Sequence, residues 1–163
     1  MSELVERVDT QDHVLHVVDR QEAVRNGWLH RVAGVVCRDP QGRVLVHRRS
    51  MAMPWCAGLY TALVGGAVKV GEGYAEAAAR EVLEELGTHA EVRPLFKFIC
   101  QGAEFPYWFG IHETVLTAEI TPDTHEIAWF DWLTLTEYRQ SAKRWPFIPD
   151  TETAFNHYLR SCT

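Results

Sequence analysis

The stretch from Gly66 to Gly87 constrains this chain most, because it joins a glycine-rich loop to a helix with an acidic face. Its second half carries apolar residues at helical spacing and then a glycine where a C-terminal cap belongs, namely Ala75, Ala78, Ala79, Val82, Leu83, Leu86 and Gly87. Glu81, Glu84 and Glu85 stand at i, i+3 and i+4, so their carboxylates share one face. Each such pair of like charges costs about 0.2–0.5 kcal/mol in an isolated helix, so we expect a cation among them.

Arg80 can offset part of this repulsion, since it lies one helical turn from both Glu76 and Glu84. One guanidinium cannot reach all three carboxylates, whereas a divalent ion can. Carboxylate oxygens are hard ligands that suit Mg²⁺, Mn²⁺ or Ca²⁺.

The loop before the helix suits a phosphate group. Its glycines, Gly65, Gly66, Gly71 and Gly73, allow a close approach of the backbone. The loop leads into a helix N-terminus, where free N–H groups and the helix dipole favour anions. The sequence therefore predicts a magnesium–diphosphate site.

The spacing of these residues resembles the Nudix box: Gly66, five residues, Glu72, seven residues, Arg80-Glu81-Val82, one residue, Glu84-Glu85, one residue, Gly87. Thr88 departs from the family, which usually has an aliphatic residue there. A charge run is more often a solvated helix face, but the complete pattern with its glycines favours the box. The resemblance implies an α/β/α sandwich with a central mixed β-sheet. It also implies hydrolysis of a nucleoside diphosphate linked to another moiety, with Mg²⁺ or Mn²⁺ as cofactor.

Within this resemblance, the acidic face receives specific roles. Glu81 and Glu85, one turn apart, are predicted to be direct metal ligands. Glu84 is either a third ligand or the general base. The carbonyl of Gly66 is the family's backbone ligand.

Two further pairs of residues support the site in this interpretation. Arg80 is predicted to pair with Glu72 and to stiffen the loop against the helix. Gly65 and Gly66 are predicted to lie against the substrate.

Residues beyond the box add candidates. A general base can come from Glu113 or Glu126, although each is as readily a surface carboxylate. His47, Arg48 and Arg49 end a strand and can contact phosphate, although basic residues there are more often simply solvated. Four aromatic residues either stack on a base or line an apolar pocket, with packing the commoner use: Trp55, Phe105, Tyr107 and Trp108.

Composition limits the class of protein. The 163 residues suffice for a single domain, residues 1–163, with residues 1–27 as an N-terminal hairpin extension packed on it. A net charge of −6 argues against general binding to nucleic acids. Ser50–Val68 lacks charged residues, but proline, glycine and polar residues break it, so no membrane span is expected. The four cysteines lack C-x-x-C spacing and no secretory leader is apparent, so we expect reduced thiols in a cytoplasmic protein.

The remaining pattern predicts strands around this helix. The expected strands cover residues 5–8, 14–18, 31–38, 43–47, 59–64, 90–92 with 95–100, 107–120 and 126–132. A short helical turn is expected at 21–26, and helices at 134–141 and 150–159, the last capped by Asp150. Asp39-Pro-Gln-Gly42 reads as a type I turn. This order predicts a mixed sheet with helices on both faces.

Other segments are similar to isopentenyl-diphosphate isomerase, which shares the Nudix fold but moves a double bond. They are Leu29–Arg31, Gly58–Thr61, Glu113, His125–Ile127 and Trp145–Pro149. The isomerase needs a cysteine and a metal-binding histidine where this chain has Gly65 and Ala67, and a second histidine near Ala23. Cys56 is a poor substitute and more simply a buried thiol. His30 is then expected to be packed or hydrogen bonded, not a ligand.

These features predict a Mg²⁺- or Mn²⁺-dependent hydrolase that cleaves a diphosphate linkage of a small molecule by water attack at phosphorus. An isomerase-like enzyme and a non-catalytic nucleotide or metabolite sensor are the alternatives. Three metal carboxylates argue against the sensor, because binding alone does not need them. A homodimer through the N-terminal hairpin is compatible with the sequence, which does not demonstrate it.

Overall fold

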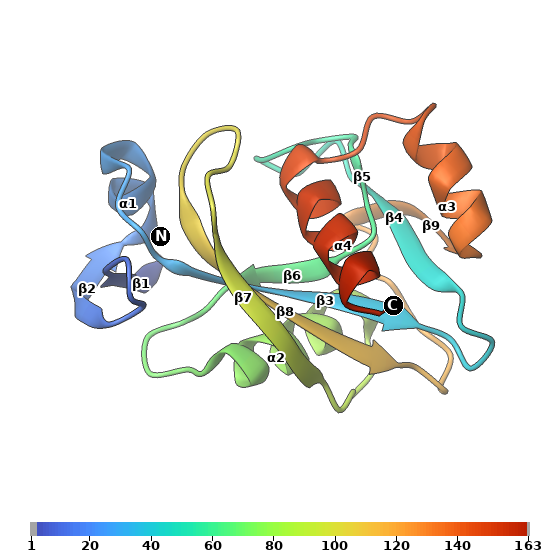
Figure 1. Cartoon of the computed structure of the whole chain (residues 1–163), viewed down its shortest axis with the longest axis horizontal. Helices are drawn as coiled ribbons and strands as arrows, with labels where there is room; N and C mark the ends of the chain where they lie inside the picture. The colour runs from blue at the N-terminus through green and yellow to red at the C-terminus, as the bar shows by residue number, and fades with distance from the viewer. Residues whose placement is uncertain (1–2, 163) are drawn as a thin grey trace.

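The computed structural model describes residues 3–162, and within them a mixed seven-stranded sheet forms the centre (Figure 1). The strands run in the order β5-β4-β3-β8-β7, with β6 paired to β3 and β9 to β4. Their bounds are β3 Arg31–Arg38, β4 Val44–Arg49, β5 Tyr60–Thr61, β6 Val64–Ala67, β7 Arg93–Cys100, β8 Tyr107–Val115 and β9 Ile127–Leu133. β3 and β8 pair in parallel, from Arg31 opposite Trp108 to Arg38 opposite Val115. The predicted mixed sheet is therefore confirmed.

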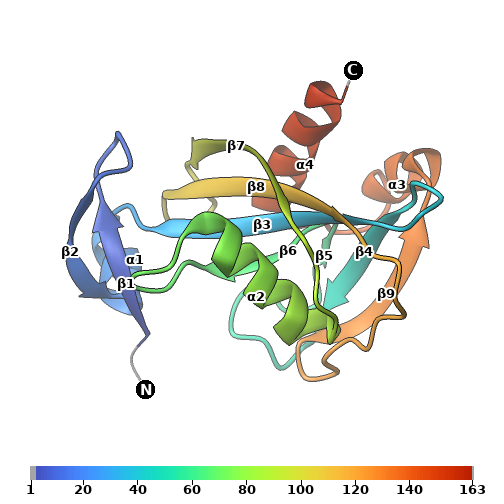
Figure 2. The same cartoon turned by 90° about the horizontal axis from the view of Figure 1, so that it is seen from below.

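Helices cover both faces of the sheet (Figure 2). Helix α2 (Tyr74–Leu86) lies on one face, and α3 (Leu135–Ala142) and α4 (Pro149–Ser161) lie on the other. Neighbouring strand residues point to opposite faces, so Val35 packs with the α2 cluster and Val36 with the α4 cluster. The α/β/α sandwich follows from this alternation, because a central strand buried on both sides must be apolar on both sides.

The N-terminal residues form a separate two-stranded sheet followed by a short helix. β1 (Leu4–Val8) pairs antiparallel with β2 (Val14–Asp19), and α1 (Arg20–Asn26) follows directly. The predicted hairpin is confirmed. Asp19 caps α1 by accepting a hydrogen bond from the backbone of Gln21, and Gly27 ends the helix in the left-handed conformation.

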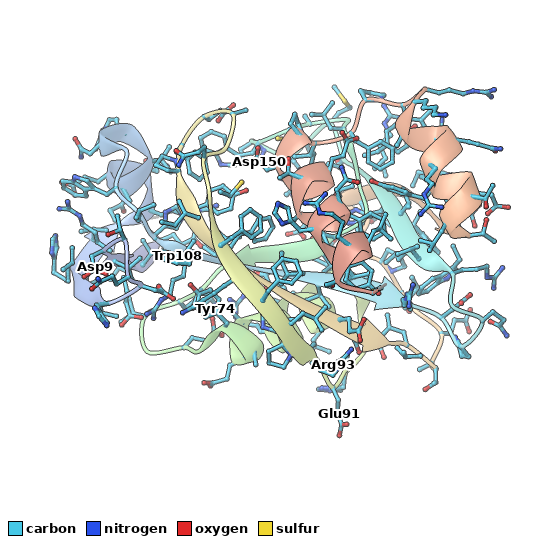
Figure 3. The ribbon with its side chains drawn as sticks, viewed as in Figure 1. Asp9, Tyr74, Glu91, Arg93, Trp108 and Asp150 are labelled. Carbon is cyan, nitrogen blue, oxygen red and sulfur yellow. The ribbon has the colours of Figure 1, made fainter. Side chains whose placement is uncertain are left out.

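Asp12, in the turn of this hairpin, connects it to the body of the protein. Asp12 has a φ of 64° and is almost fully buried. Its carboxylate accepts hydrogen bonds from Arg31 Nε (2.7 Å), Lys97 Nζ (2.6 Å) and the hydroxyl of Tyr74 (2.8 Å). Nearby, Trp108 Nε1 donates to the carbonyl of Asp9, and Figure 3 shows both residues at this junction. One carboxylate therefore joins the hairpin to β3, β7 and the first residue of α2.

Several element boundaries differ from expectation. The predicted strand at 59–64 is two short strands, β5 and β6, and β8 ends at Val115 instead of continuing to residue 120. Residues 90–92 lie outside β7, whose residues 93–100 are continuous. Ile148, not Asp150, is the N-cap residue of α4, and Asp150 instead accepts a hydrogen bond from the Tyr107 hydroxyl at 2.9 Å. The helix therefore begins at Pro149, before the predicted start, because a proline suits the first turn of a helix.

Two other observations bear on the class of protein. None of the helices within residues 3–162 is long and apolar enough to cross a membrane. The four cysteines are free; Cys37 and Cys100 are buried, and Cys56 and Cys162 are exposed. Cys56, expected to be buried, is instead exposed and has a φ of 51°.

Candidate active site

Helix α2 places its acidic residues at graded depths, although they share one face of the helix. Ala77, Ala78, Val82 and Leu86 are buried against the sheet, whereas Leu83, another apolar residue at helical spacing, is exposed. Glu85 is only 4% exposed. The Glu81 side chain is 14% exposed and that of Glu84 is 51% exposed. The face therefore runs from a buried carboxylate to a solvated one.

Arg80 binds the loop to the helix, as predicted. Its Nε and Nη2 donate to the two carboxylate oxygens of Glu72 at 2.8 and 2.9 Å, and Nη2 also donates to the carbonyl of Ala67 at 3.1 Å. Its Nη1 donates to Glu81 at 2.8 Å and to Glu84 at 3.3 Å. Hydrogen bonds from Arg80 lower the pKa of Glu72, with its burial opposing them. Arg80 therefore neutralises the outer carboxylates.

Glu85 lies closest to the glycine strand β6. Its Oε2 accepts a hydrogen bond from the N–H of Gly65 at 3.1 Å. Burial, followed by the charges of Glu81 and Glu126, raises the pKa of Glu85 well above its ordinary value. Burial also raises the pKa of Glu81, with Arg80 opposing and Glu84 and Glu126 adding to it. The charges of Glu81 and Glu126 thus disfavour the ionised form of the buried Glu85, and a bound cation would offset this repulsion.

The glycines of β6 make room for these carboxylates. A Cβ on Gly66 would lie 2.4 Å from Oε1 of Glu81, so only a glycine leaves that carboxylate where it is. A Cβ on Gly65 would lie 2.0 Å from the carbonyl oxygen of Ala33 in the neighbouring strand. Gly66 therefore admits a side chain of the site, and Gly65 admits the adjacent backbone.

The donor set suits a hard divalent cation, because its oxygens are carboxylates and the buried one, Glu85, has no salt bridge among the described residues. In the part of the chain that the structure describes, no three His, Cys, Asp or Glu side chains already surround one metal position. Arg80 explains this, since it holds both Glu81 and Glu84. A cation would have to replace Arg80 as the partner of at least one of them.

The structure does not bring Glu113 to this face. Glu113 lies on the same side of β8 as Phe109 and Ile111, which face α4. It pairs with Arg93 and accepts a hydrogen bond from the Tyr158 hydroxyl of α4 at 3.0 Å. Figure 3 shows Arg93, the partner of Glu113, at the start of β7. Strand alternation explains the correction, because α2 covers the other face.

Glu126 is the acidic residue outside the box that does reach the site, since its charge acts on both Glu81 and Glu85. Its carbonyl accepts a hydrogen bond from the N–H of Ser50 at 2.8 Å, which fixes it beside the end of β4. The sequence favoured Glu113 over Glu126 because of the resemblance to the isomerase, whereas the pairing of β4 with β9 brings Glu126 to the site.

The basic residues at the end of β4 lie in different places. Arg49 is near the site, since its charge lowers the pKa of Glu85, against the larger effect of burial. Arg48 Nε donates to the carbonyl of Gly58 at 3.2 Å. His47 is buried with Nε2 hydrogen bonded to the carbonyl of Leu63 at 2.9 Å, so it is not placed for a phosphate.

His30 is fully buried and packed, as expected, but it is not hydrogen bonded through its ring. Phe105 stacks on it at 5.8 Å between ring centroids, and Tyr107 lies at 6.5 Å. Neither ring nitrogen has a hydrogen-bond partner among the described residues. Burial, with the charge of Arg20 adding to it, lowers the pKa of His30 from 6.5 to about 4.

This buried imidazole predicts a pH-dependent stability. The unfolded chain binds the proton below pH 6.5 and the folded chain only below about 4, so the free energy of unfolding falls as the pH drops through that window. His30 alone contributes at most about 3 kcal/mol of this change. His30→Phe should reduce the slope of unfolding free energy against pH, measured by urea denaturation between pH 7 and 4. His89→Gln, at an exposed position, is the control, and an unchanged slope in His30→Phe would contradict the assignment.

Arg80→Lys is a second test of the site's construction. A lysine keeps the charge but cannot donate two parallel hydrogen bonds to Glu72 while reaching Ala67. We expect a loss of about 1–2 kcal/mol in stability for these charge-assisted bonds. Thermal unfolding measures it, with Arg25→Lys at an exposed position as the control. Equal melting temperatures in the two variants would show that charge alone suffices.

Comparisons with known proteins agree with this geometry. The family profile described as NUDIX domain matches residues 28–151. An uncharacterised Nudix hydrolase of Streptomyces coelicolor is 37% identical over 156 residues, covering 94% of this chain and 86% of that protein. A prenyl-diphosphate phosphatase of Methanosarcina mazei is 31% identical over 147 residues, covering 88% and 86%.

The similarity to isomerases and to solved structures is also found. An isopentenyl-diphosphate Delta-isomerase of Burkholderia multivorans is 29% identical over 147 residues, covering 85% of this chain and 83% of that enzyme. A crystal structure of a Deinococcus radiodurans protein superposes with a TM-score of 0.77 at 27% identity, covering 91% of this chain and 94% of that one. With the family profile spanning most of the chain, and with the glycine strand and acidic helix in place, this protein belongs to the Nudix hydrolase family.

Proposed function

We propose that this protein is a Mg²⁺- or Mn²⁺-dependent hydrolase that cleaves a diphosphate linkage by attack of water at phosphorus. The observation that carries this proposal is the buried carboxylate of Glu85, which lies on the N–H of Gly65 and feels the like charges of Glu81 and Glu126. A structural role alone would not favour such repulsion, whereas a bound cation offsets it.

In this proposal the chain's own residues divide the work. Glu81, Glu85 and Glu84, with the Gly66 carbonyl, would hold the divalent ion. When bound, the ion would neutralise phosphate oxygens and acidify the attacking water. Glu84 or Glu126 would accept the proton of the water. Glu113 is withdrawn from this role because Arg93 and Tyr158 occupy its carboxylate.

The substrate side is proposed from position. Gly65 and Gly66 leave the backbone open to the diphosphate, and Arg49 would approach its negative charge. Arg48 is a weaker candidate, since its side chain donates to the Gly58 carbonyl. Arg80 and Glu72 would keep the loop in place and would not touch the reacting atoms.

Two substrate classes are proposed for the organic part of the molecule. The first is a nucleoside diphosphate linked to another moiety, which the family resemblance implies. The second is a prenyl diphosphate, favoured by the relative from Methanosarcina mazei that is named a prenyl-diphosphate phosphatase. We further propose a cytoplasmic enzyme that acts on small molecules and not on nucleic acid, with a homodimer through the N-terminal hairpin to be tested by its mass in solution.

Isomerisation is the weaker alternative for this site. Gly65 stands where the isomerase has its cysteine, and a side chain there would meet the backbone of Ala33. Ala67 has no metal-binding atom in its side chain. We therefore expect no conversion of isopentenyl to dimethylallyl diphosphate, and a proton NMR assay that detects it would overturn this.

The test of the proposal is a panel assay. Phosphate release from nucleoside di- and triphosphates, nucleotide conjugates and prenyl diphosphates is measured with Mg²⁺, with Mn²⁺ and with excess chelator. We expect turnover of at least one class that depends on the metal. Binding of these compounds without any turnover would favour a sensor, and turnover that survives the chelator would refute the metal-dependent mechanism.

A further inference from the structure

Asp12, in the turn of the N-terminal hairpin, contacts the helix that carries the candidate metal ligands. Its Oδ2 accepts a hydrogen bond from the hydroxyl of Tyr74, the first residue of α2, at 2.8 Å. The same oxygen accepts from Lys97 Nζ of β7 at 2.6 Å, and Oδ1 accepts from Arg31 Nε of β3 at 2.7 Å. Tyr74 lies where the hairpin meets the start of the helix (Figure 3). The hairpin therefore bears directly on α2.

The turn that presents this carboxylate is well fixed. Asp12 is 6% exposed and has a φ of 64°, a left-handed conformation that aspartate adopts more readily than most residues. Its N–H donates to the carbonyl of Asp9 at 3.0 Å, and the Asp9 carboxylate accepts two further N–H groups of the same turn. The carbonyl of Asp12 accepts from Arg31 Nη2 at 2.7 Å. The acceptor for the Tyr74 hydroxyl therefore has a defined position.

The start of α2 depends on Tyr74 for its placement. Gly73, the N-cap residue, has no side chain with which to hold the helix. The buried residues of the first half of α2 are Ala77 and Ala78, whose methyl groups interlock little with the sheet. The ring of Tyr74 is the large side chain here, and it packs so closely on β8 that a side chain on Gly110 would clash with it.

The proposed metal ligands lie further along the same helix. Glu81 follows Tyr74 by seven residues, about 10 Å along the axis at 1.5 Å per residue. Because continuous backbone hydrogen bonds make the helix stiff, a shift or rotation at Tyr74 carries to Glu81 and Glu85. Glu81 packs against the backbone of Gly66, and Glu85 accepts from the N–H of Gly65 at 3.1 Å. The distance between these carboxylates and β6 therefore depends on where α2 begins.

We propose that Asp12 is a positioning residue, which through the Tyr74 hydroxyl sets the place of α2 against β6 and so raises the affinity of the site for its divalent cation. This inference rests on the metal-dependent hydrolysis proposed above. Arg31, another partner of Asp12, accepts through its carbonyl the N–H of Val68 at 3.0 Å. The carboxylate of Asp12 thus acts at both ends of the glycine loop, residues 68–73, that precedes the helix.

Two substitutions that each remove one hydrogen bond from the same oxygen test this role. Tyr74→Phe removes the bond to α2, and Lys97→Met removes the bond to β7, both at Oδ2 of Asp12. Lys97→Met also removes a positive charge beside a buried carboxylate, so we expect it to lower the melting temperature more than Tyr74→Phe does. Thermal unfolding measures this order.

The affinity for Mn²⁺ alone should change in the opposite order. Isothermal titration measures it in 0.15 M salt, which screens distant charges such as that of Lys97. We expect Tyr74→Phe to weaken Mn²⁺ binding about tenfold, the lower end of the loss when an outer partner of a metal ligand is removed. Lys97→Met should stay within about twofold of the wild type, because its bond does not reach α2.

The two measurements separate positioning from a merely structural role. Affinity that follows the melting temperatures, with Lys97→Met the weaker binder, would overturn the inference and leave the proposed function standing. Unchanged Mn²⁺ binding in Tyr74→Phe would do the same. Wild-type protein that binds no Mn²⁺ would refute the proposed metal site and this inference with it. Circular dichroism of each variant establishes that it is folded.

Discussion

Glu85→Gln should abolish metal-dependent hydrolysis and, at the same time, stabilise the metal-free protein. Removal of one ligand charge from the ion should lower kcat/KM by about 10²–10³, the scale of several kcal/mol of transition-state stabilisation. The metal-free protein should gain about 1–3 kcal/mol, since a buried and incompletely paired charge disappears. Phosphate release and urea denaturation measure the two effects.

The sign of the stability change can be followed with pH. The pKa of Glu85 is raised in the folded state, so the folded chain binds the proton more readily than the unfolded chain. Its contribution to the free energy of unfolding is therefore present at acid pH and is lost as the pH rises above the ordinary value of about 4.3. The gain from Glu85→Gln should grow over that range and shrink when Mg²⁺ is added to the wild type. Glu76→Gln, at an exposed position of the same helix, is the control, and an equal gain there would contradict the buried-charge account.

Gly65→Ala and Gly66→Ala should have different effects although they are adjacent. At Gly65 the new methyl group meets the backbone of β3, which cannot give way, so we expect a loss of stability of about 2–4 kcal/mol. At Gly66 it meets the carboxylate of Glu81, which can turn aside. Gly66→Ala should therefore keep most of its stability and lose activity, by about 10- to 100-fold, through weaker metal binding.

A double-mutant cycle tests the explanation for Gly66. If the alanine acts by displacing Glu81, its effect on activity should largely vanish in a Glu81→Gln background. Thermal unfolding and isothermal titration with Mn²⁺ provide the stability and the affinity. Additive effects of the two substitutions would show that Gly66 acts in another way.

The sequence predicted the parts of the site that depend on local spacing. The pairing of Arg80 with Glu72 and the sequence of strands around α2 follow from residues near one another in the chain. The sequence did not predict how deeply each carboxylate is buried, because that depth depends on which turn of α2 lies against β6. Glu84 and Glu85 are neighbours in the sequence, yet one is half exposed and the other buried.

Long-range placement was the other limit. Glu113 was the favoured of two candidates in the sequence, but strand alternation places it on the α4 face, and the pairing of β9 with β4 brings Glu126 to the site instead. The extent of β8 was overestimated because apolar residues continue past Val115 into a loop that packs on α2, with Leu116 in the same cluster. Periodicity reports burial, and burial is not confined to strands.

The parallel pairing of β3 with β8 has a consequence for how the chain acquires its structure. Arg31 pairs with Trp108, so the middle of the sheet can form only after residues far apart in the sequence have come together. The ribosome must synthesise and release β8 before β3 can acquire its parallel neighbour. Until then the valines of β3 lack part of their native packing. The early hairpin also lacks part of its support until β8 supplies Trp108, so we expect nascent chains cut before β8 to be prone to aggregate.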